Sequence, residues 1–101
     1  MRIKQGNTYD IELQPEYEDG TDVTNENAAV VEISLGNLIK RWPGDVVYDD
    51  GKFIMPLSQE ETFAMNGGLT LKARAKTLTG DVANGDVGVV IVGKSNSKVV
   101  L

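Results

Sequence analysis

The sequence contains no cysteine and no histidine among its 101 residues. Without cysteine the chain can form neither a disulfide framework nor a thiolate zinc site. Without histidine it lacks the commonest general base and metal ligand, so serine–histidine and cysteine–histidine catalysis are excluded. We therefore expect a protein that is not an enzyme and that carries no catalytic residue, no metal site and no cofactor.

Long apolar runs and an excess of basic residues are also missing. No run approaches the ~20 apolar residues of a membrane span, and residues 1–7 lack the apolar core of a signal peptide. Fifteen acidic residues against ten basic ones give a net charge of −5. A general nucleic-acid binder should be basic, and so should a protein that docks on an anionic membrane. We expect neither kind of partner, and we expect synthesis in the cytoplasm.

The residues that are present predict one all-β domain over residues 1–101. Its length fits a single domain, and 41% of its residues are hydrophobic. Apolar and polar residues alternate with the period of a β-strand in several short segments, and glycine-containing turn signals separate them. The expected strands cover residues 8–14, 28–35, 38–42, 45–48, 69–76 and 88–92. We expect residues 79–86 to form a hairpin loop with Asn84-Gly85 as its tight turn.

A different pattern interrupts the strands in the middle of the chain. Phe53, Met55 and Leu57 alternate with Lys52, Ile54 and Pro56, which is the period of a short strand. Ser58 then has the features of a helix N-cap, and Glu61 three residues later completes a capping box. The sequence thus predicts a single helical turn near residues 58–65, between two strands.

This central stretch carries a resemblance to a known family. It holds a glycine turn at Gly51, a short apolar strand, Leu57-Ser58, and an acidic helical turn ending Glu61-Thr62. A glycine, an alternating strand, a glycine hairpin and a final strand follow. The pattern resembles the immunoglobulin-like domain at the N-terminus of upper baseplate and tail-fibre proteins from phages of Gram-positive bacteria. The lead Gln5-Gly6-Asn7-Thr8-Tyr9 resembles that family's entry into its first strand, and the likeness spans most of the chain.

The resemblance implies an immunoglobulin-like β-sandwich in a phage or prophage virion protein, as a component of a baseplate, a tail or a head decoration. Such a protein is made in the cytoplasm of the host bacterium and acts by assembling with other virion proteins. A homo-oligomer is implied, and analogy with fibre-associated proteins suggests a trimer. Two departures exist: Leu69 and Leu71 replace an aromatic residue that the family often carries after the glycine, and the segment 38–42 is less familiar. The family has no catalytic motif to transfer.

Apolar residues near the C-terminus are the first candidates for assembly. If Val89 and Ile91 fill the core, alternation turns the neighbouring valines outward, where another element or another subunit must cover them. Three apolar residues at the terminus pose the same question. The assembly candidates are Val90, Val92, Val99, Val100 and Leu101.

A basic stripe of Lys72, Arg74 and Lys76 is the second candidate surface. Three cations on one face of a strand could bind an acidic protein surface, which suits an acidic protein better than a nucleic-acid partner does. The plainer interpretation is a solvated strand face, or lysines that protect the edge of a sheet.

Trp42, the only tryptophan, is the third candidate. An exposed tryptophan beside cations could stack on a sugar, with Tyr48 as its neighbour across a hairpin. This would make the protein a carbohydrate-binding module on an immunoglobulin-like sandwich, which is the alternative function. The plainer interpretation places Trp42 in the core or at its rim.

The acidic residues Glu18, Asp19 and Asp22 surround a turn. Calcium takes six to eight oxygen ligands, often from such loops. The spacing here fits no EF-hand, so we interpret the segment as a solvated turn.

Overall fold

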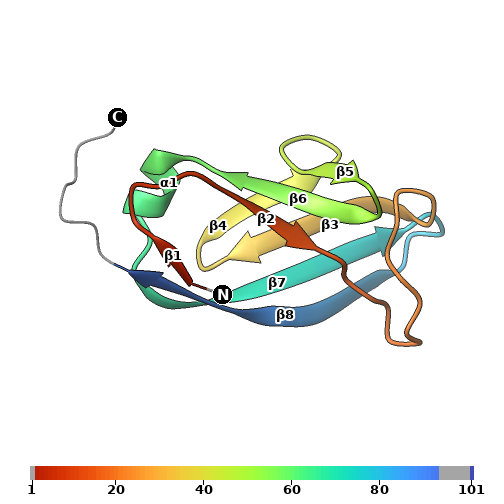
Figure 1. The fold of residues 1–101 in the computed structure, drawn as a ribbon. Coiled ribbons are helices and arrows are strands. Elements are labelled where there is room, and N and C mark those ends of the chain that lie inside the picture. Colours follow the sequence, from red (N-terminus) through yellow and green to blue (C-terminus); the bar gives the residue numbers. More distant parts are fainter. Residues whose placement is uncertain (1, 94–100) are drawn as a thin grey trace.

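The computed structural model describes residues 2–93 and 101, and within residues 84–92 it describes the backbone alone. The chain forms eight strands and one short helix in that part (Figure 1). In chain order these are β1 (Arg2–Lys4), β2 (Tyr9–Leu13), β3 (Ala28–Leu35), β4 (Leu38–Trp42), β5 (Val47–Asp49), β6 (Lys52–Leu57), α1 (Gln59–Phe63), β7 (Gly67–Thr77) and β8 (Val82–Gly93).

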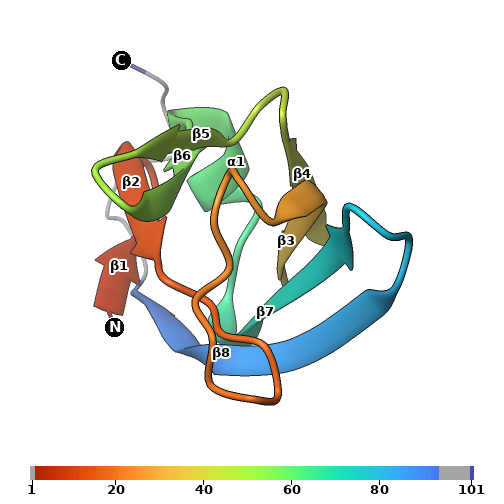
Figure 2. The ribbon, with the colours of Figure 1, turned by 90° about the vertical axis from the view of Figure 1, so that its right-hand side faces the viewer.

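The strands build two sheets that pack as the layers of a sandwich (Figure 2). The larger sheet has the order β1-β8-β7-β3-β4 and the smaller one the order β2-β6-β5. All pairs are antiparallel except β1 with β8, which is parallel. The strands β2, β5 and β6 take the places of B, D and E in an immunoglobulin domain, and β3, β4, β7 and β8 take those of C, C′, F and G. The predicted immunoglobulin-like sandwich with one helical turn is confirmed.

The core lies between the two sheets, and its residues follow the predicted alternation. On β3, Val31, Ile33 and Leu35 are buried while Glu32 and Ser34 between them are partly exposed. The same period of two on the other long strands places every second residue inside. Buried residues from β2, β6 and β7 complete the core: Ile11, Leu13, Phe53, Met55, Leu57, Leu71, Ala73 and Ala75.

The helical turn α1 begins where the capping box predicts. The Ser58 hydroxyl accepts a hydrogen bond from the Glu61 N–H at 3.1 Å, and Glu61 Oε1 accepts one from the Ser58 N–H at 2.8 Å. Both bonds satisfy N–H groups that have no partner within a helix. The turn lies at one end of the sandwich and joins the smaller sheet to the larger one (Figure 1).

The expected turn at Asn84-Gly85 is wrong, because both residues lie within β8 and pair with Arg74 and Ala73. The hairpin turns earlier. The Thr77 N–H donates to the Asp81 carbonyl at 2.8 Å, and the Asp81 N–H donates to the Thr77 hydroxyl at 3.1 Å. This side-chain bond stabilises a turn over residues 77–81. The longer ladder that results absorbs an extra residue in a bulge beside Leu71.

Candidate interaction surface

The basic stripe lies in the middle of a sheet rather than at its edge. Strand β7 pairs with β3 on one side and with β8 on the other. Lys72, Arg74 and Lys76 are exposed and alternate with buried Leu71, Ala73 and Ala75. The stripe therefore occupies the outer face of the larger sheet, and protection of an edge does not explain it.

The register of three strands brings Glu32 between two arginines of this outer face. Glu32 of β3 pairs with Arg41 of β4 and with Arg74 of β7. Glu32 Oε2 accepts from Arg41 at 3.1 Å, and Glu32 Oε1 accepts from Arg74 at 2.8 Å. Only 15% of the Glu32 side chain is exposed, against 67% for Arg41 and 51% for Arg74. Hydrogen bonds between ionised groups are stronger than neutral ones, so one covered carboxylate orients two exposed guanidinium groups.

We call Arg41, Arg74 and Lys76 the basic patch. A shallow hollow of about 260 Å³ lies among them. Its lining holds these three cations and one carboxylate, Glu32, which leaves a local charge of two positive units. Val82 also lines the hollow and is 58% exposed. The alternation of residues 69–76 predicted two members of the patch, Arg74 and Lys76. No local pattern indicated Arg41 or its contact with Glu32, because the register of β4 on β3 brings these two side chains together.

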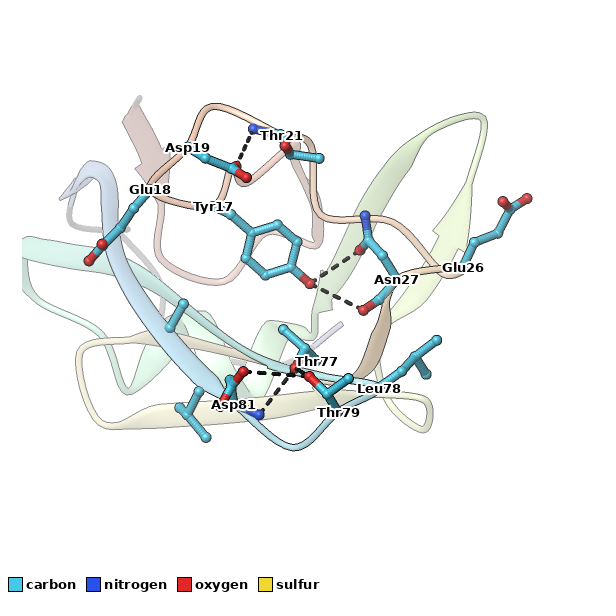
Figure 3. Close-up of a pocket in the computed structure, with 12 residues that line it drawn as sticks. Tyr17, Glu18, Asp19, Thr21, Glu26, Asn27, Thr77, Leu78, Thr79 and Asp81 are labelled. Carbon is cyan, nitrogen blue, oxygen red and sulfur yellow. Dashed lines mark hydrogen bonds between the residues drawn. The ribbon is translucent and has the colours of Figure 1, made fainter.

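A larger groove, of about 790 Å³, opens at the end of the sandwich opposite α1 (Figures 1 and 3). One wall is the connection from β2 to β3, and the other is the turn from β7 to β8. We call it the acidic groove, because its lining contains four carboxylates and neither lysine nor arginine. The four are Glu18, Asp19, Glu26 and Asp81.

Tyr17 stands at the centre of the acidic groove (Figure 3). Its hydroxyl can donate to Asn27, whose carbonyl oxygen lies at 3.4 Å and whose Oδ1 lies at 3.2 Å. Burial raises the pKa of the Tyr17 phenol, and the negative charge of Asp19 raises it further. The pKa of Asp19 is itself lowered, mainly by the hydrogen bond that its carboxylate accepts from the Thr21 N–H. Asp19 therefore keeps its negative charge beside the ring.

The two walls of the groove meet where Ala28 of β3 pairs with Thr77 of β7, and the side-chain hydrogen bonds lie within each wall. Each hydrogen bond drawn in Figure 3 joins residues of the same wall: Tyr17 to Asn27, Asp19 to Thr21, and Thr77, Thr79 and Asp81 among themselves. Within the part of the chain that the structure describes, no three histidine, cysteine or acidic side chains are placed to hold a metal ion together.

Trp42 lies at the rim of the core, in agreement with the plainer interpretation. It is half-buried and packs against the core. Its ring meets Phe53 at 5.5 Å between centroids, and Tyr48 at 6.5 Å. Tyr48 is a neighbour of Trp42, as predicted. The two residues do not face each other across a hairpin, however, because β4 and β5 belong to different sheets and the contact bridges the two sheets.

The apolar assembly candidates lie at the margin of the described residues. Val99 and Val100 lie outside them. The backbone of Val90 pairs with Leu69, and that of Val92 pairs with Gly67 and with Ile3, so Val92 has a strand on each side. Their side chains are not described. Leu101 is fully exposed, and its N–H donates to Gln59 Oε1 at 3.0 Å.

The sequence matches no family model, and it matches no curated protein. Among residues 2–93 and 101, no helix is long and apolar enough to cross a membrane. We therefore infer the function from the geometry and charge of these surfaces, together with the resemblance.

Proposed function

We propose that the protein is a non-enzymatic assembly module that binds an acidic protein surface through the outer face of its larger sheet. The observation that carries this proposal is the bonding of Glu32 to Arg41 and Arg74, which orders two exposed arginines on one flat face. Binding normally costs about 0.5–1.5 kcal/mol for each flexible side chain that becomes immobile. Side chains that are ordered beforehand reduce that cost.

Composition of the patch also favours a protein partner. Arginine is enriched at protein interfaces, and lysine and glutamate are depleted. Val82 adds an exposed apolar side chain beside the arginines. The whole chain carries −5, so it repels a polyanion such as nucleic acid at long range. A protein with a local acidic patch fits the local positive charge better.

Three of the outer strands have features that hinder association by strand pairing, whereas β2 and residues 82–90 of β8 also lie at sheet edges. The outer strands β1 and β5 have three residues each. Strand β4, at the other edge of the larger sheet, turns Lys40 inward, where its ammonium group contacts Glu61 at 2.9 Å. Short edge strands and inward-pointing charges are features that prevent edge-to-edge pairing. They favour contact through the face of the sheet.

From the resemblance we infer that the partners are virion proteins, in a baseplate, a tail or a head decoration. The protein would then be made in the host bacterial cytoplasm and incorporated during particle assembly. Mass spectrometry of purified particles from the encoding phage or prophage tests this. Recovery of the protein at a fixed copy number supports the virion role, and its absence from the particles contradicts it.

Titration of the isotope-labelled protein with a short peptide rich in aspartate and glutamate tests the binding face by NMR. We expect the backbone amides of β3, β4 and β7 around Glu32 to shift, and the shifts to weaken in Arg74→Glu. A matched peptide with asparagine and glutamine should leave them unchanged. Equal responses to both peptides would contradict the proposal. A response of Trp42 fluorescence to sugars, without a response to the acidic peptide, would favour the carbohydrate-binding alternative.

A further inference from the structure

The basic patch and the acidic groove are neighbours on the surface. Val82 lines both of them, and it pairs with Lys76 of the patch. Leu78, at the tip of the same hairpin, lines the groove and is 68% exposed. The surface is therefore continuous, with positive charge on one side, negative charge on the other and exposed Val82 where they meet.

Resting on the function proposed above, we propose that the acidic partner is a second copy of this chain, bound about a two-fold axis. The basic patch of each copy then meets the acidic groove of the other. A two-fold interface is self-complementary: if residue i of one copy contacts residue j of its partner, j also contacts i. A surface with opposite charges on its two sides matches itself when one copy is turned by half a turn.

The exposed apolar residues of this surface, Val82 and Leu78, suit the centre of such an interface. The axis passes near Val82, which lines both charged regions, with exposed Leu78 on the groove side of it. Protein interfaces commonly have an apolar centre and a polar rim. Exposed apolar side chains gain free energy when a partner covers them, because their surface is removed from water.

The charges of the two surfaces are opposite in sign, and their side chains are of kinds that bind each other. The basic patch has a local charge of two positive units, and four carboxylates line the groove. A guanidinium group can bind a carboxylate with two parallel hydrogen bonds and can also stack on an aromatic ring. The acidic groove offers both kinds of contact, the carboxylates and the ring of Tyr17. The groove, of about 790 Å³, has room for a side chain of the partner.

Sedimentation equilibrium on the full chain, across a concentration series at low salt, tests the proposal. We expect twice the monomer mass, and dissociation as salt rises, because exposed charge pairs are screened. Arg74→Glu with Lys76→Glu should weaken the dimer at least tenfold, and so should Glu18→Lys with Glu26→Lys. Lys76→Glu alone leaves the contacts of Glu32 intact and should weaken it in the same direction. Lys52→Glu and Asp49→Lys each reverse one charge on the smaller sheet, by two units as Lys76→Glu does, and should have no effect.

Mixing the two double variants is the decisive measurement. The patch variant repels its own groove, and the groove variant, whose lining then carries no net charge, no longer attracts its own patch. In a mixed pair the unchanged patch of one copy meets the unchanged groove of the other, and the new carboxylates meet the new lysines, so a one-to-one dimer should form again. A trimeric mass, a failure of the mixture to associate or a wild-type chain that stays monomeric would each overturn the two-fold contact. If the monomeric chain still binds the acidic peptide at Arg74, the proposed function stands and only the identity of the partner is wrong.

Discussion

The two ends of the sandwich use their polar residues differently. At the end that holds α1, hydrogen bonds join segments far apart in the sequence. Gly6 donates its N–H to the Thr62 hydroxyl at 2.9 Å, and that hydroxyl donates to the Asn7 carbonyl at 2.9 Å. At the groove end, the hydrogen bonds of the β2–β3 connection join residues no more than ten positions apart, as Tyr17 and Asn27 are.

Charged groups follow the same division. Glu61 binds Lys40 at 2.9 Å, and Lys40 also donates to the Pro56 carbonyl. Only 14% of the Lys40 side chain is exposed. The carboxylates of the acidic groove and the arginines of the basic patch remain at the surface. At the α1 end, largely covered polar side chains thus tie distant segments together. At the other end Arg74 also binds Glu32 across 42 positions, but the arginines and the groove carboxylates keep their charges accessible to a partner.

Alanine at Gly6 should show this difference most strongly. Gly6 has a φ of +81°, and a Cβ there would lie 2.6 Å from the Phe63 ring. We expect Gly6→Ala to lower the free energy of unfolding by about 2–4 kcal/mol, from a left-handed backbone and overpacking together. Gly20 at the groove end has a φ of +86° and no atom within 4 Å of such a Cβ. Gly20→Ala should cost about 1–2 kcal/mol from the backbone alone. Urea unfolding of both variants measures the loss of unfolding free energy. Equal losses would show that the two ends of the sandwich do not differ in this way.

Lys40→Met should have the next largest effect. It leaves the Glu61 carboxylate and the Pro56 carbonyl without their cation, and removing one partner of a largely covered pair costs about 1–3 kcal/mol. Lys76→Met removes an exposed cation at the groove end, where we expect a change within about 0.5 kcal/mol. Thermal and urea unfolding at neutral pH compare the two. A loss for Lys76→Met as large as that for Lys40→Met would show that the two ends do not differ in this way.

Ser58→Ala tests the cap of α1. Loss of the hydroxyl that accepts from the Glu61 N–H should cost about 0.5–2 kcal/mol. Thr24 at the groove end accepts in the same way from the Glu26 N–H, at 3.3 Å in an exposed turn. Thr24→Ala should cost less, since that bond is longer and closes no helix. Unchanged urea midpoints for Ser58→Ala would mean that the capping box adds nothing to stability.

The smallest expected effect is the dependence of stability on acid pH. Burial acts to raise the pKa of Glu61, but the hydrogen bond from the Ser58 N–H and the bond and charge of Lys40 outweigh it, so the pKa is lowered. A carboxyl whose pKa is lower in the folded state stabilises the protein above its unfolded pKa, and this contribution is lost as pH falls through the folded value. The stability gap between wild type and Lys40→Met should therefore narrow between about pH 5 and pH 2. Urea titrations at several pH values check this, and a gap that stays constant would remove the role assigned to Glu61.

Local patterns in the sequence predicted most of the elements. The alternation over residues 28–35 predicted β3 and its buried face, and Ser58 with Glu61 predicted α1. The predicted turn at Asn84-Gly85 was wrong because two turn signals lie close together. The chain turns at residues 77–81 instead, where the Asp81 N–H donates to the Thr77 hydroxyl. A local sequence pattern does not distinguish two nearby turns, because the pairing of β8 with β7 determines which of them forms.

Local sequence patterns predicted less of the two surfaces that we propose to bind a partner. Alternation turned Glu32 and Arg74 outward, but nothing local indicated that they meet, since they are 42 positions apart. Strand β4 is similar: it was predicted as extended, but its register on β3 turns Lys40 inward toward Glu61 and Arg41 outward toward Glu32.

The sequence by itself determined the class of this protein: an all-β fold whose strands alternate and in which the helical turn after β6 carries its own cap. These are decided by interactions between residues a few positions apart, which a linear pattern records. Tertiary structure alone decided which charges pair within the fold and which stay exposed, because the register of distant strands sets those distances. It also placed the basic patch beside the acidic groove, since the two walls of the groove come from connections about sixty residues apart along the chain.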